Sequence, residues 1–152
     1  MIELEALLDL WAEVHTRPVG SGPYGNRWIF EVSCGEFQGP RLRGKVLQSG
    51  GDWMLVGSDQ VARLDVRLTL ETHDSALVYM QFLGVLDVND KLLAAVQGSH
   101  EAQYGDTLFM TQPRFETGDS RYTWLNRYVG LSEGKLSPNR VDYRVYQAKP
   151  VP

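Results

Sequence analysis

Apolar and polar side chains alternate with a period of two residues over much of the chain from Asn26 onward. The clearest case is Arg63–Glu71, in which leucine and valine at the even positions alternate with charged or polar side chains at the odd positions. A period of two places successive side chains on opposite faces of a β-strand. The segment is therefore predicted to form a strand with one apolar and one charged face.

Similar patterns predict further strands, separated by Gly, Pro, Asp and Ser. Ala76–Val85 is almost continuously apolar, which is typical of a strand covered on both faces. Turn residues at Gly50–Asp52 and at Pro113 are expected to divide the segments around them. Strands with turn signals at this spacing indicate an all-β sandwich or barrel. The other predicted strands are Trp28–Cys34, Leu42–Val46, Trp53–Val56, Leu108–Gln112, Phe115–Thr117, Tyr122–Leu131 and Val141–Ala148.

Two segments also carry helical signals. Near residues 88–97, Asn89 or Asp90 can cap a short helix, and Gly98 stands where a helix ordinarily ends. Leu4–His15 fits two patterns, because its apolar residues recur at helical spacing and some of them also alternate as in a strand. Propensity alone favours a helix there, since Leu, Glu and Ala are strong helix formers.

Length and composition indicate one globular domain, residues 1–152, with 43% hydrophobic residues. No segment approaches the roughly 18–20 uninterrupted apolar residues of a membrane helix. The start, Met1–Glu5, is acidic where a secretory signal is basic, and the single cysteine suits a reducing compartment, so a cytoplasmic location is expected. The net charge of −4 argues against a nucleic-acid partner, and no membrane partner is expected either.

Five short sequence motifs that follow one another along the chain together resemble the family named domain of unknown function 3237. The resemblance covers nearly the whole chain and implies an antiparallel β-barrel of lipocalin-like shape, with Leu4–His15 as its first strand. Asp65 and Arg67 belong to the family motif, whereas Ser75 replaces a turn glycine of the family pattern and Met110 replaces an arginine. No catalytic assignment comes with the resemblance. The motifs are Phe37–Val46, Gly50–Trp53, Leu64–Thr72, Phe115–Gly118 and Tyr122–Arg127.

The charged face of the strand Arg63–Glu71 supplies the first candidate site. Asp65 and Arg67 lie two residues apart on one face, and, because the resemblance places both in the family motif, we expect this face to point into the barrel. The guanidinium would then keep the carboxylate ionised and bind an enolate, carboxylate or phenolate. Glu71 or Glu116, desolvated in the barrel, would serve as general acid or base. The alternative is that these charges face water, as most charged side chains do.

An aromatic and amide set supplies the second candidate site. Tyr122, Trp124 and Asn126 would share one face of a strand and form a pocket wall that stacks a planar ligand, with Tyr79 joining it. The alternative is an aromatic core with satisfied polar tips. The remaining candidate ligand-binding residues are Asp52 and Trp53, of which Asp52 could equally be a turn residue.

Other chemical machinery is absent from the sequence. The three histidines form no metal-ligand spacing, and there is no phosphate loop, dinucleotide fingerprint or nucleophile elbow, so neither a metal nor a cofactor is predicted. The function expected is small-molecule binding in a barrel, with acid–base catalysis of the isomerase, cyclase or lyase type on a small organic acid or an aromatic or polyketide-like compound. A non-catalytic binding protein and an oligomeric structural module remain alternatives, and a homo-oligomer is compatible with each.

Overall fold

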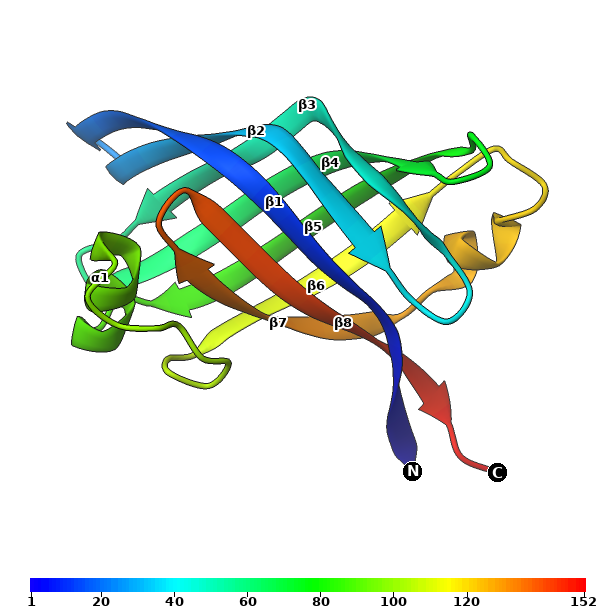
Figure 1. Cartoon of the computed structure of the whole chain (residues 1–152). Coiled ribbons are helices and arrows are strands. Elements are labelled where there is room, and N and C mark those ends of the chain that lie inside the picture. Colours follow the sequence, from blue (N-terminus) through cyan, green and yellow to red (C-terminus); the bar gives the residue numbers. More distant parts are fainter.

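The computed structural model describes residues 1–152 and shows eight antiparallel strands closed into a barrel (Figure 1). Each strand pairs with its neighbours along the chain, and β8 pairs with β1. The predicted all-β barrel with one short helix near 88–97 is confirmed. The elements are β1 (Ile2–Gly22), β2 (Gly25–Gln38), β3 (Arg43–Val56), β4 (Val61–Thr72), β5 (Leu77–Asp87), α1 (Asp90–Gln97), β6 (Phe109–Glu116), the 3₁₀ helix η1 (Thr123–Arg127), β7 (Gly130–Ser137) and β8 (Arg140–Pro150).

The apolar faces of the strands fill the inside of the barrel. On β4 every even position from Ala62 to Leu70 is buried, whereas Arg63 and Arg67 are exposed and Asp65 is only half-buried. The expectation that Asp65 and Arg67 point inward is therefore wrong. The physical reason is the period of the strand: turning this charged face inward would turn four leucine and valine side chains out into water.

β1 is a strand along its whole length. This agrees with the family resemblance and not with helix propensity, which favours a helix over Leu4–His15. It pairs with β8 as far as Glu13 and with β2 as far as Gly22. Hydrogen bonding to two neighbours thus outweighs the helix propensity of its leucine, alanine and glutamate residues. Beyond Glu13, β1 no longer pairs with β8 and forms with β2 a hairpin, the β1–β2 ribbon, in which β2 stays paired with β3.

Two predicted interruptions lie inside continuous strands. Gly50, with a φ of 116°, forms an irregularity in β3 instead of a turn, and the strand continues to Val56. Pro113 lies in the middle of β6, which pairs with β7 only through Met110 and Thr111. Past Thr111 this side of β6 is a free edge, and edge strands tolerate proline because no ladder hydrogen bond is lost.

Helix α1 lies at one end of the barrel (Figure 1), which we call the α1 end. The side chain of Asn89 accepts a hydrogen bond from the backbone N–H of Leu92, and Gly98 ends the helix in a left-handed conformation with a φ of 82°. Both capping predictions are confirmed. The same end carries the β3–β4 turn and the β7–β8 turn at Pro138 and Asn139.

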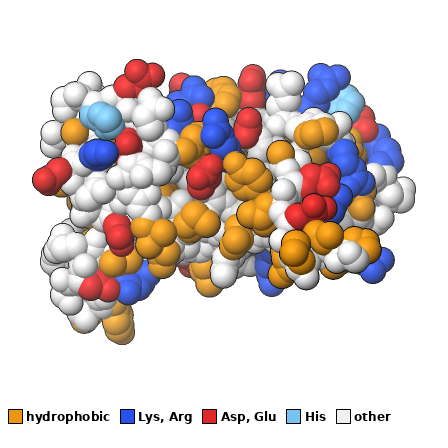
Figure 2. All heavy atoms as spheres, turned by 90° about the horizontal axis from the view of Figure 1, so that it is seen from below, with side chains coloured by type: hydrophobic (Ala, Val, Ile, Leu, Met, Phe, Trp, Pro, Cys, Tyr) orange, Lys and Arg blue, Asp and Glu red, His pale blue; other side chains and the backbone are white.

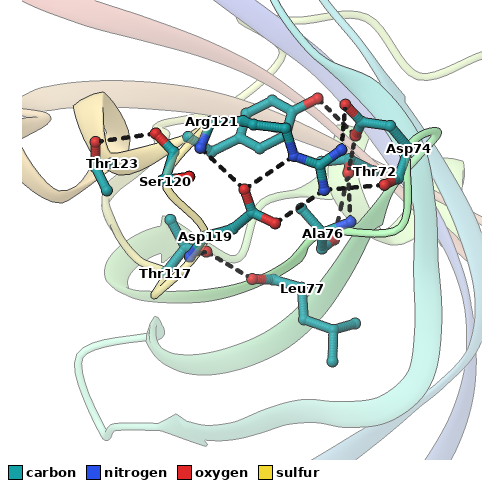
Figure 3. Close-up of polar contacts among 10 residues, drawn as sticks. Thr72, Asp74, Ala76, Leu77, Thr117, Asp119, Ser120, Arg121 and Thr123 are labelled. Atoms are coloured by element: carbon teal, nitrogen blue, oxygen red, sulfur yellow. Dashed lines mark hydrogen bonds and ion pairs between the residues drawn. The ribbon is translucent and has the colours of Figure 1, made fainter.

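A polar network joins two loops at the opposite end, which we call the η1 end (Figure 3). Arg121 forms ion pairs with Asp119 and Asp74, at 2.9 and 3.2 Å. The carboxylate of Asp74 also accepts hydrogen bonds from the hydroxyls of Thr72 and Tyr122, at 2.6 and 2.8 Å. These bonds hold the β4–β5 turn against the segment that leads into η1, and the pKa of Asp74 is lowered chiefly by the Thr72 and Tyr122 hydroxyls.

We expect Tyr122→Phe to lower the free energy of unfolding by about 1 kcal/mol, because the hydrogen bond from the buried Tyr122 to the half-buried Asp74 carboxylate is lost while the ring packing remains. Urea denaturation followed by circular dichroism measures the change. Tyr24→Phe is the matched control, since Tyr24 is 82% exposed at the tip of the β1–β2 ribbon. Equal stability of the Tyr122→Phe variant and the wild type would contradict a structural role for this hydroxyl.

Candidate functional site

One carboxylate, that of Asp52, points into the apolar interior. Asp52 pairs with Phe30 on β2 and with Val66 on β4, and Val66 belongs to the inward face of its strand. One carboxylate oxygen of Asp52 accepts a hydrogen bond from the backbone N–H of Asp65, at 3.0 Å. No cation lies within ion-pair distance of Asp52, so this acid sits among apolar side chains with a single protein donor.

Burial is the main reason that the pKa of Asp52 rises from its ordinary value of 3.8 to about 7. The hydrogen bond from the Asp65 N–H lowers the pKa, and the negative charge of Asp65 outside the barrel raises it. A carboxyl with a pKa near neutrality is divided between its protonated and ionised forms at physiological pH. Such a group can both accept and donate a proton during a reaction.

Tyr143 on β8 lies against the same part of the interior. Its ring packs edge-on against Phe82 and Phe109, at centroid distances of 5.0 and 5.7 Å. Its hydroxyl forms no hydrogen bond with another protein group, although the side chain is only 4% exposed. Burial, together with the charge of Asp52, raises the pKa of Tyr143 well above its ordinary value, so the hydroxyl stays protonated and is free to donate.

Asp52 and Tyr143 line one small cavity of about 40 Å³. A cavity of this size holds one or two water molecules, and polar partners make such water stable. Apolar side chains from all eight strands form almost all of the remaining wall. The other lining residues are Leu10, Ala12, Val14, Phe30, Val32, Gly51, Met54, Leu64, Val66, Leu68, Leu86, Phe109, Leu136 and Val141.

The cavity lies towards the α1 end of the barrel. On β3, Met54 and Val56 separate Asp52 from the turn at this end, and Asp52 itself keeps some exposure. The strand ends carry a ring of half-buried apolar residues that pack on the core without being enclosed by it. This apolar rim consists of Val14, Trp28, Phe30, Val56, Val88 and Leu136. Three residues of the rim, Val14, Phe30 and Leu136, also line the cavity, so its wall is least enclosed by the core at the α1 end.

A second polar feature of the interior is a pair of hydroxyls where β6 and β7 meet. Thr111 and Ser132 are cross-strand partners, each 1% exposed, and their hydroxyl groups are hydrogen-bonded to each other. They satisfy one another, as buried polar groups must. The pair therefore stabilises the short contact between β6 and β7, and neither hydroxyl is available to a ligand.

Most of the residues predicted as catalytic or ligand-binding lie outside the barrel, on alternate positions of its strands. The guanidinium of Arg67 lies 5.9 Å from the ring of Trp53, and neither Asp65 nor Arg67 has an ion-pair partner. The structure brings none of these residues to the cavity. The residues with outward side chains are Trp53, Asp65, Arg67, Glu71, Tyr79 and Glu116.

The predicted aromatic wall is wrong because its residues are not on a strand. Thr123–Arg127 forms η1, a 3₁₀ helix, and β7 begins only at Gly130. Trp124 stacks under the guanidinium of Arg41 at 3.6 Å, outside the cavity. The side-chain amide of Asn126 pairs with both the N–H and the C=O of Thr117, at 2.8 and 2.9 Å. Together with the Tyr122 hydroxyl, these contacts close the η1 end.

Of the predicted site residues only Asp52 lines the cavity, and Tyr143 was missed. Its one sequence signal is its position between Val141 and Val145, on the apolar face of a strand. That alternation places the ring inside but says nothing of the free hydroxyl. The hydroxyl's lack of a partner depends on side chains from other strands, which no local pattern reports.

A much larger hollow, about 1070 Å³, lies on the outer surface along β1. Its wall includes Glu71 and carries balanced charges, with Arg43, Lys45, Lys135 and Arg144 opposed by four carboxylates. Lys135 and Arg144 lie on the ring of Tyr104 there, at 5.0 and 4.2 Å, so these cations are already engaged by groups of the wall. The structure contains no cluster of three or more metal-ligating side chains. None of its helices is long and apolar enough to cross a membrane.

Comparisons with known proteins agree with this architecture. A UPF0311 protein of Rhodopseudomonas palustris is 30% identical over 123 residues, covering 81% of this chain and 80% of that protein. A crystal structure of a protein of unknown function from R. palustris has a TM-score of 0.89 at 27% identity, covering 98% and 99% of the two chains. A beta-barrel like protein from Acinetobacter baumannii has a TM-score of 0.82 at 29% identity, covering 98% and 97%.

A more distant structure, described as an enzyme from Penicillium herquei, has a TM-score of 0.67 at 16% identity and covers 96% of this chain and 95% of that one. At this identity the likeness concerns the fold. The family model for proteins of unknown function DUF3237 matches residues 2–148. This chain, a β-barrel with one carboxylate in its apolar interior, therefore belongs to the DUF3237 family.

Proposed function

We propose that this protein binds a small, mainly apolar molecule inside the barrel and acts on it by acid–base chemistry through Asp52. The observation that carries the proposal is the pairing, in one cavity, of a carboxyl with a pKa of about 7 and a tyrosine hydroxyl that has no protein partner. Asp52 is a largely buried acid with a single protein donor, and burying a carboxyl with so few hydrogen bonds is costly in a fold that could replace it with an apolar residue. A ligand that hydrogen-bonds to both groups accounts for their presence.

The two groups have complementary roles. The ionised carboxylate of Asp52 removes a proton from a carbon or hydroxyl of the ligand, and the acid form returns it elsewhere on the same molecule. The hydroxyl of Tyr143 donates a hydrogen bond to the oxygen on which negative charge develops. These two proton transfers together isomerise the ligand. The same chemistry gives a cyclisation when the ligand carries a suitable acceptor group, and an elimination when it carries a leaving group. The chemistry needs no cofactor.

The wall of the cavity indicates the class of ligand. Aliphatic and aromatic side chains surround Asp52 and Tyr143, and no guanidinium or ammonium group faces them. A free carboxylate or phosphate would lose its hydration there without a cation in exchange. We therefore propose a neutral or phenolic compound with one ring as the ligand. Strongly acidic compounds are no longer proposed. Because the cavity is only about 40 Å³, the ligand must displace Met54 and the apolar rim as it enters.

Non-catalytic binding is the second candidate function, supported by the absence of a second titratable group with a pKa near neutrality in the cavity. The fungal protein of similar fold that is described as an enzyme favours catalysis. Turnover separates the two candidates, because a binding protein leaves its ligand unchanged.

We expect a thermal-shift screen with small phenolic and cyclic ketone compounds to find ligands that raise the melting temperature of the wild type. Asp52→Asn should abolish turnover of such a ligand while preserving its binding, because the amide keeps the shape of the carboxyl but cannot take up a proton. Chromatography of the incubated ligand measures turnover. Glu101→Gln, which changes an exposed carboxylate in a loop, is the matched control and should leave turnover unchanged. Full turnover by the Asp52→Asn variant would refute the acid–base role.

Tyr143→Phe should weaken ligand binding by about tenfold, because one hydrogen bond is lost, without lowering the stability of the free protein. The stability is preserved because the wild-type hydroxyl has no protein partner to lose. Titration calorimetry and urea denaturation measure the two quantities. A loss of stability with unchanged affinity would assign the hydroxyl to the fold instead of the ligand.

The raised pKa of Asp52 also predicts a pH dependence of folding. Asp52 binds its proton more tightly in the folded than in the unfolded state, so its contribution to stability falls as the pH rises from about 4 to about 7. Relative to Asp52→Asn, the wild type should lose about 2–4 kcal/mol across this range. Urea denaturation of both proteins at a series of pH values measures the difference. Parallel stability profiles would show that the carboxyl titrates in its ordinary range.

A further inference from the structure

The outer surface of β5 and its neighbours is apolar where water would favour polar residues. Leu83 and Val85 on β5 are 58% and 38% exposed, and Met110 on β6 is 37% exposed. Val85 and Met110 are cross-strand partners. Trp53, 38% exposed, stands on β3 beside Asp65, which in turn pairs with Leu83. We call Trp53, Leu83, Val85 and Met110 the outer patch.

The outer face of β5 is mainly apolar, with Gln81 and Asp87 as its polar residues, whereas an antiparallel strand that faces water usually has a polar outer face. Its inner face fills the barrel, but no helix or loop of this chain covers its outer face, because α1 and η1 lie at the two ends (Figure 1). Figure 2 shows the molecule from the side on which β6 and β7 lie in Figure 1, where hydrophobic side chains also reach the surface between charged ones. Contiguous apolar surface of this kind marks a contact with another molecule.

The charges within the outer patch identify that molecule. Asp65 and Arg67 lie two residues apart in the patch, and neither has an ion-pair partner within the chain. A surface that carries one free carboxylate beside one free guanidinium is complementary to itself. In a contact between two copies related by a two-fold axis, Asp65 of one copy meets Arg67 of the other, and the reverse pair forms by symmetry.

We propose that the outer patch is a homodimer interface in which the apolar residues of the two copies pack together and Asp65 and Arg67 pair across the axis. The interface also accounts for two charged residues of the family motif that the interior site does not use. It lies on the opposite side of the barrel wall from the cavity and does not depend on the function proposed there.

Sedimentation-velocity measurements over a range of concentrations up to about 0.1 mM test the proposal on the full chain. The wild type should be a dimer. Leu83→Glu should raise the dissociation constant of the dimer at least 30-fold, roughly the effect of losing a central apolar contact. Leu93→Glu on α1 is the matched control, because Leu93 is 48% exposed and remote from the patch. Circular dichroism confirms that each variant is folded.

A charge exchange tests the geometry of the contact. Asp65→Arg and Arg67→Asp should each weaken the dimer about tenfold or more, and the double variant should restore it to within a few-fold of the wild type. A wild type that remains monomeric would overturn the proposal. So would dissociation by Leu93→Glu that equals the dissociation by Leu83→Glu, or a double variant that is no stronger than the single ones.

Discussion

Closure of the sheet is the constraint on which the rest of this structure depends. When β8 pairs with β1, every strand acquires one face that points inward and one that points outward, and the period of two settles which side chain goes where. The inward set of aliphatic residues fills the barrel so completely that one cavity of about 40 Å³ remains beside Asp52. A charged residue in the inward set is therefore an exception that needs a reason, whereas the charged residues of the outward set need none.

The same closure explains which parts of the sequence could be interpreted. Alternation in Arg63–Glu71 predicted β4 correctly, and the caps at Asn89 and Gly98 predicted α1, because both signals are local. The direction of the charged face was predicted incorrectly. An alternating pattern defines two faces without saying which is inside, and the presence of Asp65 in a family motif does not decide the direction either. A motif residue can equally serve an outer surface.

Other errors arose where tertiary pairing overrides local signals. Gly50 and Pro113 look like turns in the sequence, yet Gly50 bends β3 without ending it and Pro113 occupies a free edge of β6. The segment from Tyr122 alternates as a strand would, but it forms η1, where Asn126 and Tyr122 bond to the η1-end loops. Asp52 was a candidate from sequence, but its combination with Tyr143 could not be predicted, because the two residues lie 91 positions apart in the chain and meet only in the closed barrel.

The small volume of the cavity bears on how a ligand is recognised. Around Asp52 the wall is apolar and closely packed. Burial of this acid therefore lowers the stability of the protein without ligand, because most of its hydrogen-bonding capacity is unused. Displacing the half-buried rim costs less than opening a fully packed core, since these side chains keep contact with water already. A ligand that replaces the rim's contacts with its own apolar surface, and offers polar atoms to Asp52 and Tyr143, recovers both costs together. Selectivity would then come from this coupling: an apolar molecule without the polar atoms leaves the carboxyl buried and unpaired, and a highly polar one cannot pass the rim.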